Sequence, residues 1–192
     1  MSMIYIRGFE DQNLTSPDSG WNTTIELSSI PGGGYAARTQ GNTGGSLSLS
    51  VSEMSIDDSP DFTECYIRMY VKIGSLGVGT GSLYWSVIDS SGSDIVKLQG
   101  HGVVWISGVD KGWHGGCVIG TSWTRLEFGI KVNSVSGHVI IRVDGETEYS
   151  ISTDLSAHAA VGCLKMYDNT GVNLVWMDDI VINDTQGARN NS

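Results

Sequence analysis

Carboxylates are the first residues that could do chemistry here, because glycoside hydrolysis needs two of them facing each other across the scissile bond. Glu127 lies in an alternating run from Trp123 to Glu148, but Gly129 stands two residues on, where a second carboxylate would share its face. Glu146 and Glu148 have the required spacing, yet they follow a tight turn and are expected on a solvated edge. The run therefore predicts no glycosidase pair.

Histidines and a nucleophile would offer a second chemistry, acyl transfer through an activated side chain. No Gly-x-Ser-x-Gly segment is present. The histidines are dispersed along the chain, at His101, His114, His138 and His158. The sequence predicts a protein that is not an enzyme.

Clustered aspartates are possible ligands for Ca²⁺, which prefers oxygen donors. The metal candidate is the turn that carries Asp57, Asp58 and Asp61. Further acidic pairs are Asp89 with Asp94 and Asp178 with Asp179. Aspartates also cap turns through their own backbone, which is the alternative for the turn groups. In a regular strand, one member of the last pair points inward and needs a hydrogen-bonding partner. No cofactor is predicted, and binding of Ca²⁺ is kept as an alternative.

Composition and charge restrict the class of protein. The chain has 192 residues, a net charge of −10 and a pI near 4.6. An acidic protein repels the phosphates of nucleic acids, and the chain has no basic run to offset that repulsion, so a nucleic-acid partner is not expected. The length fits one domain. We predict a single domain over residues 1–184 and a polar tail over residues 185–192.

The three cysteines and the N-terminus bear on the compartment. Cys65, Cys117 and Cys163 form no Cys-x-x-Cys pair, which favours reduced thiols, and Cys65 falls on the apolar side of a strand. The opening residues MSMIYIRGFED lack a basic start and an apolar segment, so no signal peptide is expected. No apolar run reaches membrane-spanning length, so no membrane partner is expected. We predict synthesis in a reducing cytoplasm.

Alternation of apolar and polar residues dominates the chain and positions every candidate above. Asp144-Gly145 predicts a type I′ hairpin turn within the run from Trp123 to Glu148. Leu83 to Ile88 and Ile95 to Leu98 predict another hairpin. No convincing helix is found. Strands are also expected at 3–9, 47–51, 62–73, 103–106, 149–152, 161–166 and 174–182. Many short strands with glycine-rich turns indicate an all-β, two-sheet antiparallel sandwich or jelly roll.

Four pieces of sequence resemble a known family. The first is a strand ending in Phe9-Glu10-Asp11, and the second is the strand YIRMYVKI at 66–73. The third is Trp123-Thr-Arg-Leu-Glu127 with the later turn at Asp144-Gly145. The last is WMDDIVINDTQG at 176–187. Together they resemble the concanavalin A-like lectin/glucanase (LamG-like) jelly rolls, in particular those of tailed-bacteriophage structural proteins. Glucanases of this family carry Glu-x-Asp-x-x-Glu, and the single Glu127 departs from that motif.

The resemblance implies a possible glycan site. Lectins of this fold present an aromatic platform beside polar groups at a loop-rich rim. Trp113 and His114, in the glycine-rich segment 108–120, fit that description, and Trp21 and Tyr35 lie in similar loops. Packing of Trp113 on the sheet is the alternative. The remaining tryptophans, expected in the core, are Trp85, Trp105, Trp123 and Trp176.

The resemblance also implies a virion role. Tyr66, Arg68, Tyr70 and Lys72 alternate with apolar residues and form an outward stripe that could contact another subunit. An ordinary exposed sheet face is the alternative. We therefore predict a non-enzymatic bacteriophage virion protein, synthesised in the host cytoplasm. It would decorate the capsid, bind major capsid or tail proteins and form a homo-oligomer. The alternative is a carbohydrate-binding tail or fibre module for host surface glycan.

Overall fold

The structure is a computed structural model that describes residues 3–7, 22–27, 35–40, 46–50, 63–74, 83–168 and 174–183. For the first four ranges the description covers the backbone alone. The predicted tail at 185–192 lies outside the described residues. In the described part, no helix is long and apolar enough to span a bilayer.

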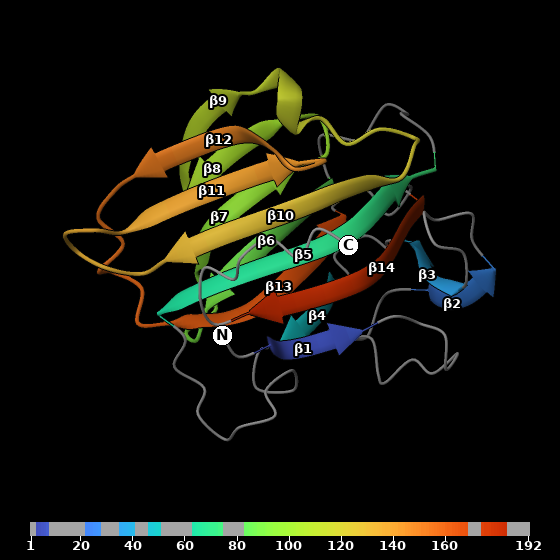
Figure 1. The fold of residues 1–192 in the computed structure, drawn as a ribbon, viewed down its shortest axis with the longest axis horizontal. Coiled ribbons are helices and arrows are strands. Elements are labelled where there is room, and N and C mark those ends of the chain that lie inside the picture. The colour runs from blue at the N-terminus through green and yellow to red at the C-terminus, as the bar shows by residue number, and fades with distance from the viewer. Residues whose placement is uncertain are drawn as a thin grey trace.

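Two antiparallel sheets form the molecule and face each other as layers (Figure 1). The eight-stranded sheet has the order β12-β11-β10-β5-β14-β3-β2, and β1 also pairs with β14. Its strands are β1 (Met3–Arg7), β2 (Asn22–Leu27), β3 (Tyr35–Gln40), β5 (Glu64–Ile73), β10 (Thr124–Lys131), β11 (His138–Val143), β12 (Glu146–Ser152) and β14 (Leu174–Asn183). This arrangement confirms the predicted all-β sandwich.

The six-stranded sheet forms the second layer, in the order β4-β13-β6-β7-β8-β9. Its strands are β4 (Ser46–Ser50), β6 (Leu83–Asp89), β7 (Asp94–Gln99), β8 (Val103–Ile106), β9 (Val109–Trp113) and β13 (Val161–Asp168). A short 3-10 helix, η2 (Gly115–Cys117), follows β9 and contacts β11 and β12 of the other sheet. The edge strand β9 therefore lies at the same end of the sandwich as β12.

The core lies between the sheets, and the period-two pattern explains which side chains enter it. In β5, buried and half-buried residues alternate along the whole strand. Cys65, Ile67 and Met69 are buried on the inner face, as predicted. Each fully buried aliphatic or aromatic side chain contributes about 1.5–3 kcal/mol, so this layer of contacts is the main stabilising term of the fold.

The predicted hairpins are confirmed. Phe128 pairs with Ile141 across β10 and β11, and both side chains are buried. Asp144 and Gly145 have φ of 52° and 93°, which a type I′ turn requires. β6 and β7 form the second predicted hairpin.

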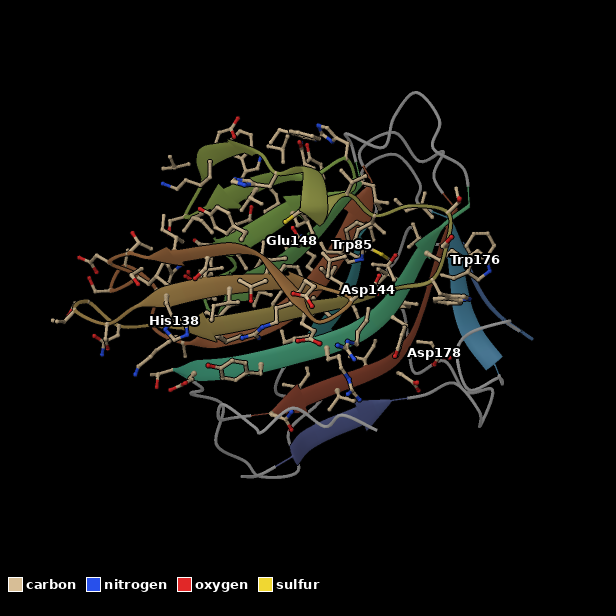
Figure 2. All side chains as sticks on the ribbon, turned by 45° about the horizontal axis from the view of Figure 1, so that its top comes forward. Trp85, His138, Asp144, Glu148, Trp176 and Asp178 are labelled. Carbon is tan, nitrogen blue, oxygen red and sulfur yellow. The ribbon has the colours of Figure 1, made fainter. Side chains whose placement is uncertain are left out.

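Two expectations about the tryptophans and the loop at 108–120 are wrong in part. That segment contains β9 and η2 rather than an irregular loop. Trp85 is buried between the sheets as predicted, whereas Trp176 is only half-buried on β14 (Figure 2). Trp105 and Trp123 are half-buried as well. Their positions in the alternation place Trp105 and Trp176 on outer faces, where lysines cover the rings.

The aspartate pair in β14 does not alternate as a regular strand would. The register with β5 shifts between Asp178 and Val181, and Asp179 has a φ of 48°. Asp178 is buried, and its Oδ1 accepts a hydrogen bond from the Asp179 amide at 2.8 Å. The bulge turns the Asp179 amide toward the Asp178 carboxylate and so gives one of its oxygens a hydrogen bond. A buried carboxylate needs such bonds.

Candidate functional site

A polar face covers the outer side of β5, β10 and β11, opposite the core. Because side chains alternate along a strand, every second residue of these strands points away from the six-stranded sheet. The members are half-buried rather than fully exposed, so they pack against one another on the sheet. We call this surface the basic face; its charged members are Glu64, Arg68, Lys72, Arg125, Glu127, Lys131 and Arg142, and His138 lies among them.

Glu127 lies at the centre of the basic face. Register places it between Arg68 on β5 and Arg142 on β11. Its Oε1 is 2.9 Å from Arg125 Nε, and its Oε2 is 3.8 Å from Arg142 Nη1. The single negative charge of Glu127 therefore holds Arg125 and Arg142 in place but does not neutralise both of them.

Tyr66 lies over the backbone at one side of this cluster. A Cβ on Gly129 would approach Tyr66 Cε1 to 2.8 Å, so glycine at that position lets the ring lie on the sheet. The Tyr66 hydroxyl donates to Glu64 Oε1 at 3.2 Å, and Lys131 Nζ is 3.9 Å from Glu64 Oε2. Gly129 thus occupies the position where a second carboxylate would be needed, and its lack of a side chain leaves space for the Tyr66 ring.

Aromatic rings surround a lysine near the other end of β5. Lys72 Nζ lies 4.7 Å from the ring centroid of Trp176 and 5.8 Å from that of Trp123. Cation–π contacts of this kind contribute about 0.5–1 kcal/mol at exposed sites. The basic face therefore combines cations with half-buried rings along one sheet.

Charge distinguishes the basic face from the protein as a whole. On the described strands β5, β10 and β11, the basic face carries five cations, Arg68, Lys72, Arg125, Lys131 and Arg142, and two carboxylates, Glu64 and Glu127. The whole chain carries −10. An anion approaching this sheet would meet a local field opposite in sign to the net charge.

The predicted stripe of Tyr66, Arg68, Tyr70 and Lys72 does share the outer face of β5. Its role as an interface between subunits stays a prediction. Sequence reasoning did not include Arg125 or Arg142 in the stripe, because pairing of β10 and β11 beside β5 sets that neighbourhood.

Among the described members of the predicted glycan set, the fold keeps Tyr35 apart from Trp113 and His114. Trp113 is 66% exposed, and its Nε1 donates to the His101 carbonyl at 2.9 Å. His114 packs edge-on against Tyr149, with centroids 4.6 Å apart. Tyr35 begins β3, near the opposite end of the sandwich from β9 (Figure 1). Trp21 lies outside the described residues.

The predicted metal turn, Asp57, Asp58 and Asp61, also lies outside the described residues. Among the residues that the structure does describe, no three His, Cys, Asp or Glu side chains are grouped to hold a metal. Asp89 caps a turn, whereas Asp94 begins β7, accepts a hydrogen bond from Ser86 Oγ and lies 3.5 Å from Lys97 Nζ. Asp89 Oδ1 accepts from the amides of Ser91 and Ser93 at 2.9 and 2.8 Å.

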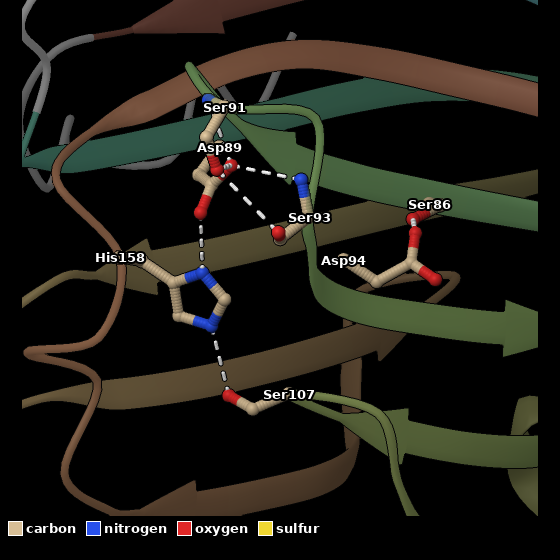
Figure 3. Close-up of polar contacts among 7 residues, drawn as sticks. All are labelled: Ser86, Asp89, Ser91, Ser93, Asp94, Ser107 and His158. Carbon is tan, nitrogen blue, oxygen red and sulfur yellow. Dashed lines mark hydrogen bonds and ion pairs between the residues drawn. The ribbon is translucent and has the colours of Figure 1, made fainter.

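A second cluster joins residues far apart in the sequence (Figure 3). Asp89 Oδ2 lies 2.7 Å from His158 Nδ1, and His158 Nε2 lies 2.9 Å from Ser107 Oγ. Asp89 and His158 are 4% and 6% exposed, whereas Ser107 is exposed. Burial raises the pKa of Asp89, but hydrogen bonds from Ser91, His158 and Ser93 outweigh it and lower the pKa to about 2. The dispersed histidines gave no sign of this cluster.

The cysteine on the apolar side of β5 is confirmed as a small buried side chain. Cys65 and Cys117 are both buried, and neither forms a disulfide among the described residues. Burial, with the nearby Glu148 carboxylate, raises the pKa of Cys117 to about 11. Such a thiol is protonated at neutral pH and is a poor nucleophile or metal ligand.

Comparison with known proteins shows the fold. No family model and no curated protein sequence matches the chain. The chain is similar to an endo-β-1,4-glucuronan lyase from the fungus Trichoderma reesei, with 12% identity and a TM-score of 0.63. That match covers 96% of this chain and 95% of the other. The architecture is therefore a concanavalin A-like jelly-roll sandwich, as predicted.

Two further solved structures have the same architecture. A PL-14 alginate lyase from Aplysia kurodai matches with 10% identity and a TM-score of 0.55, over 95% of this chain and 99% of the lyase. Domain 4 of AbnA, an extracellular arabinanase from Geobacillus stearothermophilus, was solved with arabinotriose. It matches with 15% identity and a TM-score of 0.56, over 94% of this chain and 93% of that domain.

Proposed function

We propose that the protein binds an acidic polysaccharide along the basic face. The observation that carries the proposal is the cluster of Arg68, Arg125 and Arg142 around Glu127 on a sheet of an otherwise acidic protein. The structural neighbours support it at the level of fold, because two of them are named for lyases of glucuronan and alginate, which are polymers of uronic acids.

The chemistry of the face suits a chain of sugar carboxylates. A guanidinium group presents parallel donors that match the two oxygens of a carboxylate. Tyr66 and Tyr70 add flat apolar surfaces with a polar end, on which a sugar ring can pack. Glu127 keeps the arginines extended on the sheet, so less side-chain entropy is lost when a ligand carboxylate arrives.

Calorimetric titration with alginate and glucuronan oligosaccharides tests the proposal. Arg142→Ala should weaken binding at least about tenfold, since a hydrogen bond to a charged group contributes about 1.5–3 kcal/mol. Lys111→Ala removes an equal charge on β9, outside the face, and should leave the affinity within about twofold. Affinity should also fall with added salt. Equal losses in the two variants would overturn the proposal.

A second surface for glycan is Trp113, whose indole is 66% exposed. Trp113→Ala separates the two surfaces. If the basic face is the site, this variant binds uronate oligosaccharides as the wild-type protein does. Loss of binding in Trp113→Ala with normal binding in Arg142→Ala would move the site to β9.

We propose binding without cleavage. Hydrolysis would need a second carboxylate facing Glu127, and none lies on its own strand. Cleavage by elimination, the reaction of lyases, is tested directly. Lyases leave an unsaturated sugar that absorbs in the ultraviolet. Prolonged incubation with alginate should therefore produce no increase in absorbance. An increase that Arg142→Ala abolishes would make the protein a lyase and contradict this part of the proposal.

The virion role stays a prediction from the family resemblance. The outward stripe of β5 would serve as well for a neighbouring subunit as for a glycan. Addition of the protein to capsids and tails of a matching phage, followed by sedimentation, would test it. Co-sedimentation lost in Arg68→Ala would favour subunit binding through this face.

A further inference from the structure

The chain of hydrogen bonds from Asp89 through His158 to Ser107 has a defined direction. Asp89 Oδ1 accepts from Ser91 and Ser93, so the carboxylate acts as an acceptor and His158 Nδ1 carries the proton that joins them. In the neutral imidazole the other nitrogen is then an acceptor. His158 Nε2, at 2.9 Å, accepts the hydroxyl proton of Ser107. This is the arrangement in which a serine hydroxyl is activated for attack.

Ser107 lies at the tip of a hairpin, and the residue is exposed to solvent. It forms the two-residue turn between β8 and β9 with Gly108, and their φ values are 48° and 76°. Asn, Asp and Gly are the usual residues at the first of these positions. The Ser107 amide is fixed by the Ile95 carbonyl at 3.0 Å. A buried base and an exposed nucleophile on a constrained turn together form a built site.

We propose that Ser107, His158 and Asp89 form a nucleophilic triad that hydrolyses esters of small carboxylic acids, an activity separate from glycan binding. Ser107 Oγ attacks the carbonyl carbon while its proton passes to His158 Nε2. The bond to the alkoxy oxygen then breaks, and that oxygen leaves as an alcohol with the proton from His158. Water adds to the acyl-serine, gives a proton to His158 and releases the acid as Ser107 regains its hydrogen.

The turn also restricts the substrate class. A Cβ on Gly108 would have no neighbour within 4 Å, so an acyl group can approach the turn. Among the described residues, the Gly108 amide is given no hydrogen bond, and the amide after the nucleophile is one that serine hydrolases use for the oxyanion. A single such donor favours esters, whose alkoxide leaving groups depart more readily than amines.

A fluorophosphonate probe tests the proposal directly, because it phosphonylates activated serines far faster than ordinary side chains. Peptide mapping by mass spectrometry should place the label on Ser107. Ser107→Ala should remove it, and His158→Asn should slow labelling at least about 100-fold, as loss of a general base does. p-Nitrophenyl acetate hydrolysis should fall in the same order. Ser136→Ala, at an exposed turn serine, is the matched control and should label normally.

A role that only ties the three loops together predicts different results. Ser107 would then label no faster than Ser136 in the wild-type protein, and this result overturns the proposal. Urea-unfolded wild-type protein provides the comparison if His158→Asn does not fold. Labelling of Ser107 that persists unchanged in urea would show that the serine reacts without its base, which would also overturn it.

Discussion

Two type I′ turns of this protein have nearly the same backbone and differ in what their side chains do. Asp144-Gly145 joins β11 to β12, and Ser107-Gly108 joins β8 to β9. Asp144 Oδ1 accepts the Arg125 amide at 2.8 Å, and the Asp144 amide donates to the Arg125 carbonyl. Ser107 instead contacts His158, fifty-one residues away in sequence.

The difference lies in where each turn finds its partner. Asp144 pairs with the strand beside it, so its contacts follow from sheet register. Ser107 pairs with the loop before β13, which reaches it only when the sheet order β13-β6-β7-β8 has formed. The first turn is therefore a local device of the sheet, and the second depends on the whole six-stranded layer.

The largest expected difference in stability is between alanine variants of Asp89, which supports the Ser107 turn through His158, and Asp144, which lies in the other turn. Asp89→Ala leaves the buried His158 Nδ1 without its acceptor and also removes the bond to the Ser93 amide, and should cost about 3 kcal/mol. Asp144→Ala loses an exposed hydrogen bond and should cost about 1 kcal/mol. Urea unfolding of the two variants measures both. Equal costs would contradict the difference between the turns.

Acid should weaken the Asp89 network in particular. The pKa of Asp89 is lowered from 3.8 to about 2 in the folded protein. Its contribution is complete above the unfolded pKa and is lost as the pH falls through the folded one. At about 1.4 kcal/mol per pKa unit, this contribution to the unfolding free energy is about 2 kcal/mol. Asp89→Asn should flatten the fall in unfolding free energy between about pH 5 and pH 2, measured by urea titration.

Alanine variants of the turn glycines, Gly145 and Gly108, should differ in stability by a smaller amount. Both have positive φ, so alanine costs about 1 kcal/mol at either position. At Gly145 the new Cβ would also displace the end of the Arg125 side chain, whereas Gly108 has open space. Gly145→Ala should therefore have the lower melting temperature of the two. The reverse order would mean that the open side of Gly108 is covered in solution.

Ser107→Gly should have the smallest effect on stability. Glycine relieves the cost of positive φ, about 1 kcal/mol, and removes one hydrogen bond that contributes about as much. The unfolding free energy should change by less than about 0.5 kcal/mol, while fluorophosphonate labelling disappears. A large loss of stability would assign Ser107 a structural role instead.

Much of the fold could be predicted from local patterns. The alternation in β5 and the Asp144-Gly145 turn are sequence signals whose physical cause is local, so they were confirmed. Trp105 and Trp176 were placed wrongly in the core. Large apolar rings are usually buried, but strand parity puts these two on outer faces, where Lys97 and Lys72 cover them. The alternation that places a residue on the outer face can be read from the sequence. Which lysine of a neighbouring strand will cover the ring cannot.

The amino-acid sequence by itself determined most of the strands, their inner faces, the Asp144-Gly145 turn and the all-β class, because each depends on residues a few positions apart; β2 and β9 were not predicted. Only the tertiary structure decided that Arg125 and Arg142 surround Glu127 beside β5, and that Asp89, His158 and Ser107 form one chain of hydrogen bonds. The reason is that sheet order brings distant segments side by side, and no local pattern encodes which strands become neighbours.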